Sequence, residues 1–376
     1  MFPKITSYEL PVTSYVFMCI AIITNDDPQF PRGGAARIVE RQVEVLASAG
    51  AEVRVFCPSF AWLASSFFVR LFHHLGDFGA NRGLVREILA WQPDILISHN
   101  LTGCGFATPR RIRKLLVTSY KLPVTFRWIH FLHDVQLFEP SGQLRSARRI
   151  SSWQRVWTLL RRPALGNPDL VVSPTQWLLE AHLRRGFFKK IPSAVLPNPA
   201  PTIREVSRAV ADPTRLLYVG RLTPDKGADV LSDLVSRLVV PFELTIVGNG
   251  RLRPLFEHDK RIQILDLMPP AEVIRQMMDA DILLVPSCIE ENQPTVILEA
   301  ASVGLPVVAS DKGGIRETLG SRGYICAPRD LMAWIKAIDD LRDPQTYAQQ
   351  SAAMYELAEE HDPAGYGKRL IGLISS

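Results

Sequence analysis

Residues 281–319 constrain the fold most, because they contain a complete strand–helix–strand unit. The apolar run at 281–286 is typical of a strand that is buried on both faces. An acidic loop separates it from a helical pattern at 295–303, which Gly304 ends. A second buried-strand run follows at 307–310. This order predicts a parallel crossover unit, and therefore a sheet covered by helices.

The start of the predicted helix is a candidate ligand site, because it lies at the carboxyl end of a parallel strand. Free N–H groups near Pro294, Thr295 and Val296 would favour a phosphate. Glu299 follows one turn later, and its side chain leans back toward the helix start, where it could accept hydrogen bonds from ribose hydroxyls. Glu291 lies in the preceding loop.

Strand and helix patterns alternate through the first half of the chain, which predicts an α/β fold with a parallel sheet. Strand patterns occur at 16–24, 52–57, 94–99, 123–130, 169–173 and 191–196. Helical patterns occur at 34–48, 79–91, 106–118 and 175–185.

The second half continues the alternation after a Pro-rich segment at 196–213 that lacks periodicity. A chain of 376 residues is long enough for two or three domains. We therefore expect domains at 1–197 and 198–362, followed by a helix at 363–376. Within the second domain we expect helices at 270–280, 333–341 and 354–360 and a strand at 323–328.

The 281–319 segment resembles the donor-site motif of retaining glycosyltransferases of family 4. The residues that carry this resemblance are Glu291, Asn292, Pro294, Leu298, Glu299, Ala300, Gly304, Pro306, Val307, Gly313, Gly314 and Glu317. The resemblance implies a GT-B fold, in which two doubly wound, Rossmann-like domains face each other across a cleft. It also implies a nucleotide-sugar donor, either a UDP-sugar or a GDP-sugar.

Two cations follow the first strand of the second half and form a candidate diphosphate clamp. Arg221 and Lys226 flank a turn after Gly220. An arginine can bind phosphate as a fork and a lysine as a point charge, so the pair could neutralise a leaving nucleoside diphosphate. The segment resembles the GR…KG motif of the family, which binds the donor pyrophosphate.

The resemblance assigns further donor contacts to glycine turns and to an apolar pair. Gly33 and Gly34 open the first helix and would face the diphosphate from across the cleft. Gly248 belongs to a turn expected beside the nucleotide, and Leu267 and Met268 would lie near the base. The residue before Leu267 is an aspartate where the family commonly has glycine, so uridine and guanosine both remain open.

His133 and Glu291 are the predicted catalytic residues. His133 and Asp134 match the family's His-Asp segment, in which a histidine lies beside the transferred sugar. The resemblance implies that Glu291 contacts sugar hydroxyls. His99 also follows a strand, although a histidine satisfied within the core is the commoner case for such a position.

Composition narrows the class of protein. Lys and Arg outnumber Asp and Glu by 43 to 38, which gives a net charge of +5. Five scattered cysteines show no zinc-ligand spacing, so we expect reduced thiols, a cytoplasmic protein and no bound metal. The apolar run at 15–24 is too short to span a bilayer and reads as the first strand.

Two segments suggest contact with a membrane. Residues 60–75 place aromatic and aliphatic side chains on one helical face. Residues 145–162 combine arginines with Trp153 and Trp157 and contain no acid, which suits an anionic membrane surface. A helix packed on the sheet and a solvated basic face are the respective alternatives. No nucleic-acid-binding motif accompanies this basic charge.

The sequence therefore predicts transfer of a sugar to a hydroxyl of a saccharide or lipid-linked acceptor, in the synthesis of cell-envelope or surface polysaccharide. The protein would be cytoplasmic, with peripheral attachment to the inner face of the membrane as an open alternative. A nucleotide-sugar epimerase or phosphorylase on the same fold is the first rival interpretation. A non-enzymatic protein that binds polysaccharide or membrane is the second.

Overall fold

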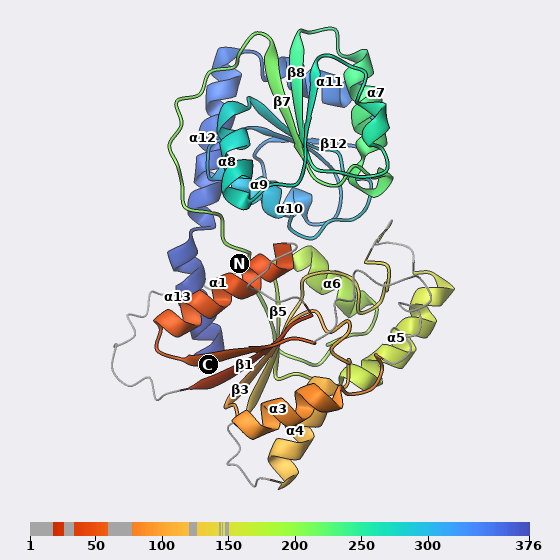
Figure 1. The fold of residues 1–376 in the computed structure, drawn as a ribbon, viewed down its shortest axis with the longest axis vertical. Helices are drawn as coiled ribbons and strands as arrows, with labels where there is room; N and C mark the ends of the chain where they lie inside the picture. The colour runs from red at the N-terminus through yellow and green to blue at the C-terminus, as the bar shows by residue number, and fades with distance from the viewer. Residues whose placement is uncertain are drawn as a thin grey trace, which may run out of the picture.

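The structure is a computed structural model that describes residues 18–25, 34–58, 77–119, 126–142, 144, 146 and 150–376. Its strands form two parallel sheets, stacked one above the other in Figure 1. Gly33 and the 60–75 segment lie outside the described residues. The expected α/β architecture of two Rossmann-like units is confirmed.

The first sheet has the strand order β2-β1-β3-β4-β5-β6. Its strands are β1 (Cys19–Ile23), β2 (Glu52–Phe56), β3 (Ile95–Ser98), β4 (Arg127–Phe131), β5 (Leu170–Ser173) and β6 (Ser193–Val195). The described helices of this half are α1 (Gly34–Ser48), α3 (Arg82–Trp91), α4 (Thr108–Ser119), α5 (Ser152–Leu165) and α6 (Gln176–Arg184).

The second sheet has the order β12-β11-β10-β7-β8-β9. Its strands are β7 (Thr214–Val219), β8 (Phe242–Val247), β9 (Ile262–Leu265), β10 (Ile282–Val285), β11 (Val307–Ser310) and β12 (Tyr324–Cys326). Its helices are α7 (Ala228–Arg237), α8 (Pro270–Asp279), α9 (Thr295–Ala301), α10 (Ile315–Leu319), α11 (Leu331–Asp340) and α12 (Pro344–Glu360).

Helices cover both faces of each sheet, which explains why the central strands are continuous apolar runs. All four residues of β3, β10 and β11 are buried. Leu217 and Leu283 pack into one core cluster with α8, α9 and α12, whereas Leu216 and Leu284 pack into another with α7 and α11. Successive side chains of a strand point to opposite faces, so each sheet divides two cores.

The last helix, α13 (Pro363–Ser375), leaves the second half and packs against the first. Tyr366, Leu370 and Ile374 join the core cluster formed by β1, β3, β4 and α1. The Gln42 amide of α1 donates a hydrogen bond of 3.0 Å to the Tyr366 hydroxyl. Figure 1 shows α13 beside α1, so the last helix of the chain lies in the same layer as the first described helix.

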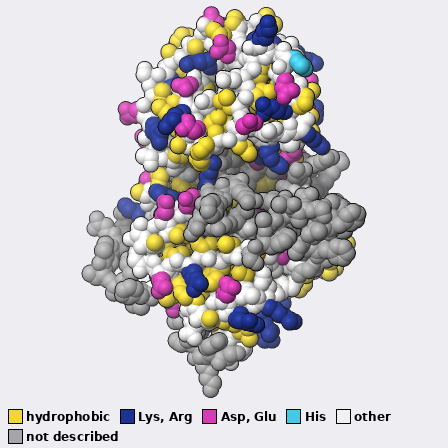
Figure 2. Space-filling model, in the orientation of Figure 1, with side chains coloured by type: hydrophobic (Ala, Val, Ile, Leu, Met, Phe, Trp, Pro, Cys, Tyr) yellow, Lys and Arg dark blue, Asp and Glu magenta, His cyan; other side chains and the backbone are white. Residues whose placement is uncertain are grey.

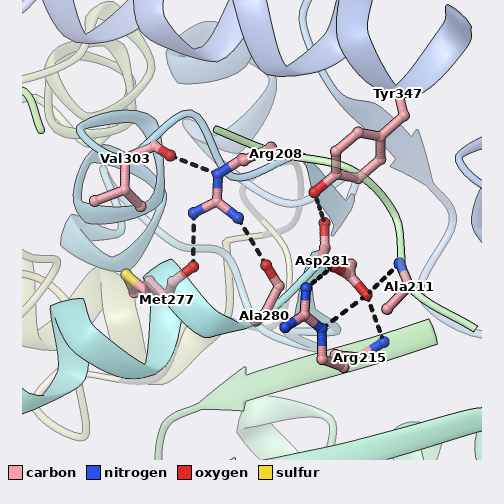
Figure 3. A network of polar contacts seen from close by, with 8 residues as sticks. All are labelled: Arg208, Ala211, Arg215, Met277, Ala280, Asp281, Val303 and Tyr347. Atoms are coloured by element: carbon pink, nitrogen blue, oxygen red, sulfur yellow. Dashed lines mark hydrogen bonds and ion pairs between the residues drawn. The ribbon is translucent and has the colours of Figure 1, made fainter. Parts of the chain in front are cut away.

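The segment before β7 is fixed to the second half by the polar network in Figure 3. The Arg208 guanidinium donates to the carbonyl oxygens of Val303, Ala280 and Met277 at 2.6, 2.7 and 2.8 Å. The buried Asp281 carboxylate accepts hydrogen bonds from the Arg215 guanidinium and from the Arg215 backbone N–H. This Pro-rich segment is therefore attached along the second half before the sheet begins.

Two helices differ from the expectations. α5 forms where the sequence suggested only a basic cluster. α12 begins at Pro344, ten residues before the expected start, because the Asp343 side chain caps its first turn by accepting from the Thr346 N–H. None of the five cysteines forms a disulfide. Within the described residues, no helix has the length and apolar content needed to cross a bilayer.

Candidate functional site

A cleft of about 430 Å³ lies between the two halves, at the carboxyl ends of their strands. Gly34, His133 and Gln136 of the first half line it together with residues of the second half. The predicted site residues that line this cleft are Gly34, His133, Arg221, Lys226, Glu291, Pro294 and Thr295. Seven positions separated by as many as 261 residues in sequence thus share one cavity.

A lysine–glutamate pair occupies the wall that the second half contributes. The Lys226 Nζ atom lies 2.6 Å from Glu291 Oε1, and both side chains are largely buried. The Ser287 hydroxyl donates a second hydrogen bond of 2.7 Å to the same oxygen. Arg221 also lines the cleft, but its guanidinium is 60% exposed and pairs with Asp225 at 2.9 Å. This wall therefore presents two cations beside a carboxylate that has one uncommitted oxygen.

Glu299 lies one turn inside α9 and reaches the first half. Its Oε1 atom lies 2.7 Å from Nη1 of Arg37, which stands one turn inside α1. The two helix starts are close, since a Cβ on Gly34 would lie 3.1 Å from Cγ2 of Thr295. Burial raises the pKa of Glu299, and the positive charge and hydrogen bond of Arg37 oppose that rise.

His133 lines the wall that the first half contributes, and His99 is buried behind it. His99 Nδ1 and His133 Nε2 share a hydrogen bond of 2.7 Å, and the His99 ring stacks on Phe131. Burial lowers the pKa of His133 to about 4 and lowers the pKa of His99 well below its usual value. Both rings are therefore neutral near pH 7, and one must donate the shared proton to the other.

Asp134 follows His133 in sequence, and burial is the main influence on the pKa of its carboxyl group. Burial raises the pKa of Asp134 to about 6, opposed by the Gln136 N–H, by the charge of Arg161 and by the Asn100 side chain. The Arg161 guanidinium of α5 is fully buried between Phe106 and Trp157 and donates to the Gln136 carbonyl. Burial lowers the pKa of Arg161 to about 9. One buried arginine thus supports the cleft wall from behind.

The two halves contact each other beside the cleft. The Thr175 hydroxyl donates to Asn292 Oδ1 at 2.6 Å, and the Asn292 amide donates to the His133 carbonyl at 3.0 Å. Glu317 of α10 accepts from the first two backbone N–H groups of α6, at 2.6 and 2.9 Å. Figure 1 shows α10 directly above α6. A carboxylate of one half therefore caps a helix of the other.

Two glycines allow backbone segments to approach closely around the site. Gly313 has φ +62°, and a Cβ there would lie 1.9 Å from the Glu291 carbonyl oxygen. Gly248 has φ +142°, and a Cβ there would lie 2.0 Å from the Gly220 carbonyl oxygen. A side chain at either position would displace the loop that carries Glu291 or the turn that precedes Arg221.

The residues expected near the base lie apart from the lining of this cleft. Leu267 is 85% exposed, and Met268 packs at the margin of a core cluster of the second half. Gly248 and Val296 are not among the residues that line the cleft. Pro294 takes the capping position of α9, so Thr295 is its first helical residue.

Sequence reasoning missed Arg37, Arg161 and Gln136. Arg37 follows the Gly-Gly turn by one helical turn, so the pattern that placed Gly34 at the cleft could also have indicated Arg37. Arg161 had no such signal, because it was one of several arginines in a segment without acids. Among the described residues, no group of three His, Cys, Asp or Glu side chains could hold a metal ion; absence of a metal stays a prediction.

Two family models match the chain, one in each half. The model described as Glycosyltransferase Family 4 matches residues 32–204, and the model described as Glycosyl transferases group 1 matches residues 213–343. A putative teichuronic acid biosynthesis glycosyltransferase of Bacillus subtilis is 28% identical over 40% of this chain and 38% of its own length. For another curated relative, the matched part is 60% of that relative's length. The chain therefore spans less than two thirds of the length of these curated relatives.

Solved structures resemble the whole chain. Sucrose-phosphate synthase from Thermosynechococcus elongatus superposes with a TM-score of 0.76 at 20% identity, over 95% of this chain and 98% of that chain. HepE of Anabaena, solved in complex with UDP and glucose, superposes with a TM-score of 0.68 at 18% identity, over 95% and 99%. At these identities the likeness confirms the GT-B fold expected from the sequence.

Proposed function

We propose that the protein, whose first half matches the Glycosyltransferase Family 4 model and whose second half matches the Glycosyl transferases group 1 model, is a retaining hexosyltransferase. It transfers a sugar from a UDP-sugar or GDP-sugar to a hydroxyl of a saccharide or lipid-linked acceptor, in the synthesis of cell-envelope polysaccharide. The observation that carries the proposal is the cleft, where Lys226 and Glu291 of one half face His133 of the other.

The donor diphosphate is bound by the second half in this proposal. Arg221 and Lys226 neutralise its charge, and the backbone near Thr295 and Val296 adds N–H donors. Gly34 lets the first half approach the phosphates, and the proposal gives Gly33 the same role. Lys226 exchanges its contact with Glu291 for a phosphate oxygen, so donor binding frees the Glu291 carboxylate for sugar hydroxyls.

Glu299 binds the ribose. Its carboxylate has room for this role, since an ionised carboxylate accepts about four hydrogen bonds and Arg37 occupies one oxygen. In this proposal Gly248, Leu267 and Met268, which belong to the same half as Glu299, lie near the base. The two halves then close on the donor, a motion common among enzymes with lids and paired domains. Whether the base is uridine or guanosine stays open.

His133 contacts the transferred sugar from the first half. Because its ring is neutral, it can donate or accept a hydrogen bond without adding charge beside the breaking bond. The leaving phosphate takes the proton of the acceptor hydroxyl, so the reaction requires no separate general base. A polysaccharide product is supported by the likeness to the Bacillus teichuronic acid biosynthesis glycosyltransferase, and a UDP donor by the likeness to the HepE complex with UDP and glucose.

The domain limits and the location are parts of the same proposal. We place one domain at 1–197 and the other at 198–362, with the helix at 363–376 returning to the first. Six-stranded sheets on either side of the Pro-rich segment support the first limit, and the packing of Tyr366 and Leu370 supports the second. We propose a cytoplasmic protein without a resident metal.

The first experiment is a thermal-shift screen of nucleoside diphosphates and nucleotide sugars, followed by calorimetry. A ligand that binds only the folded protein raises its stability by an amount that grows with concentration above the dissociation constant. We expect one nucleoside diphosphate to raise the unfolding temperature, and Glu299→Ala to remove that rise. Failure of every nucleotide to bind would contradict the proposal and favour the non-enzymatic interpretation.

The second experiment identifies the reaction. The nucleotide sugar that binds is incubated with and without saccharide acceptors, and the products are examined by proton NMR. Transfer with the same anomeric configuration as the donor is expected. An epimerised nucleotide sugar, or phosphorolysis of a saccharide, would instead support the rival enzyme classes.

A further inference from the structure

Helix α5 exposes large apolar side chains while polar groups occupy much of its buried face. That buried face carries Gln154, Thr158 and the fully buried Arg161 beside the apolar Trp157 and Leu165. Four large apolar side chains are instead exposed to solvent: Trp153 (57%), Val156 (51%), Leu159 (71%) and Leu160 (49%). A surface helix of a globular protein normally shows the reverse arrangement. The exposed stripe therefore requires an explanation other than folding of the chain itself.

The spacing of these residues makes one continuous surface. Positions 153, 156 and 160 follow the three- and four-residue intervals of one helical stripe, and Leu159 lies beside it. Arg155 and Arg162 are exposed and border this stripe along the helix. We call these six residues the α5 outer face. It combines an indole, aliphatic side chains and arginines, which is the composition of a helix that lies in a membrane interface.

The charge around the α5 outer face favours an anionic partner. Residues 95–168 contain twelve Lys and Arg but only two acids, Asp134 and Glu139, whereas the whole chain has a net charge of only +5. Neighbouring α4 adds exposed Arg110, Arg111 and Lys114 and the 59% exposed Val117. Figure 2 shows blue side chains gathered low on the first half. The exposed basic residues of α4 and α5, two helices that pack together, thus border this apolar stripe.

The α5 outer face is also connected to the cleft. On the opposite side of the helix, Arg161 donates to the carbonyl of Gln136, which lines the cleft, and the Gln154 amide donates to Glu139 at 2.8 Å. The Leu144 carbonyl accepts from the Glu290 N–H of the second half at 2.7 Å. Residues 134–142 therefore link the helix to the cleft.

We propose that the α5 outer face, with the basic end of α4, docks the protein on an anionic lipid surface. Trp153, Val156, Leu159 and Leu160 enter the interface, and the surrounding arginines meet lipid phosphates. The docking itself does not depend on the proposed function. Its consequence does rest on that function: the acceptor is lipid-linked and reaches the cleft from the docked membrane. A second copy fits less well, because a symmetric contact would place like charges opposite each other.

Vesicle sedimentation tests the docking without any nucleotide. The full chain is mixed with vesicles of phosphatidylcholine alone or with phosphatidylglycerol in equal parts. We expect binding to the anionic vesicles only, weakened by added salt because the charges are screened. Absence of binding to the anionic vesicles would overturn the proposal, and it would leave the donor-binding result untouched.

Paired variants separate the apolar and the charged contributions. Leu159→Ser with Leu160→Ser should lower the partition coefficient at least about tenfold, since two exposed aliphatic groups are removed. Arg155→Glu with Arg162→Glu should abolish the preference for anionic vesicles. Matched controls in the second half, Leu255→Ser with Met332→Ser and Arg237→Glu, change equally exposed residues and should bind as the unchanged protein does.

Two outcomes of the variants would contradict the proposal. Unchanged vesicle binding by both α5 pairs would assign docking to another surface. A dimer that dissociates in the Leu159→Ser, Leu160→Ser variant, measured by light scattering, would make the α5 outer face an interface between copies. Retention of the nucleotide-induced thermal shift in every variant shows that the fold and the donor site are intact.

Discussion

The two walls of the cleft use different chemistry. The second half presents paired charges, with Lys226 on Glu291 and Arg221 on Asp225. The first half presents the neutral ring of His133, which shares a hydrogen bond with the neutral ring of the buried His99 behind it. Both walls stand at the carboxyl ends of parallel strands, so the fold alone does not explain the contrast.

The contrast suggests that the two walls have different roles in the proposed reaction. A nucleoside diphosphate carries negative charge and gains more as it leaves, so the wall that binds it needs mobile cations. An acceptor hydroxyl is neutral, and a wall of neutral hydrogen-bonding groups orients it without competing for the diphosphate. Within the described part of the chain, Arg37 and Glu299 form the single ion pair between the first half and the second half.

The largest effect is expected at the charged wall. Lys226→Met removes the cation that we assign to the diphosphate, and it should lower kcat/KM for the nucleotide sugar about 100-fold or more. Lys336→Met is the matched control, because Lys336 lies on α11 in an exposed pair with Asp340. Initial rates and calorimetric affinity for the nucleoside diphosphate measure both variants. Equal loss in the two variants would contradict the assignment.

The next effect concerns the neutral wall and acid stability. His133 has a pKa near 4 when folded and an ordinary value of 6.5 when unfolded, so the unfolded chain takes up its proton first as the pH falls. The free energy of unfolding should therefore decrease between pH 6.5 and 4, by about 3 kcal/mol from this one group. His133→Asn should remove that part of the pH dependence in denaturant unfolding, and an unchanged dependence would contradict this assignment.

Asp134 sharpens this comparison because its effect has the opposite sign. Its pKa is raised to about 6, so the folded protein takes up this proton first and gains stability as the pH falls from 6 toward 4. Asp134→Asn should therefore steepen the loss of stability on acidification relative to the unchanged protein. A shallower curve would show that the carboxylate is already ionised through this range.

The bounds of helices and strands could be predicted from the sequence more accurately in the second half than in the first. β10, β11 and α9 lie within two residues of their expected bounds, because buried apolar runs ended by Gly or Pro carry a strong local signal. α5 is hard to recognise as a helix because polar and apolar residues are mixed on both its buried and its exposed face. The segment therefore indicates only a basic cluster with indoles, for which a membrane surface and a solvated face were the two interpretations.

The cross-cleft contacts were harder to predict for a different reason. Arg37 and Glu299 are separated by 262 positions, and nothing local in either helix indicates the other. Glu299 and Glu291 were both assigned to the cleft from the family resemblance, but their partners Arg37 and Lys226 follow only from the arrangement of the two halves. Residue type and spacing can suggest a charged site, whereas pairing across domains requires coordinates.

A smaller effect is expected from separating the two walls at their ion pair. Arg37→Met leaves the Glu299 carboxylate, 12% exposed, without its cation. The loss of a hydrogen bond to a charged group should lower the unfolding free energy by about 2 kcal/mol. Arg41→Met, whose partner Glu44 is exposed on the same helix, is the matched control and should have little effect. Equal stability of the two variants would mean that the Glu299 carboxylate does not depend on Arg37.

The smallest effect is expected where the halves meet outside the cleft. Glu317 caps α6 of the opposite half, so Glu317→Ala should cost about 1 kcal/mol of stability, as the loss of a helix cap does. Because this cap crosses the interface, the variant should also loosen the two halves and raise KM for the donor while kcat stays nearly constant. Asp343→Ala removes a cap that lies wholly within the second half, so it should lower stability by a similar amount without changing KM. An equal change of KM in the two variants would show that the cap across the interface does not fix the relative position of the two walls.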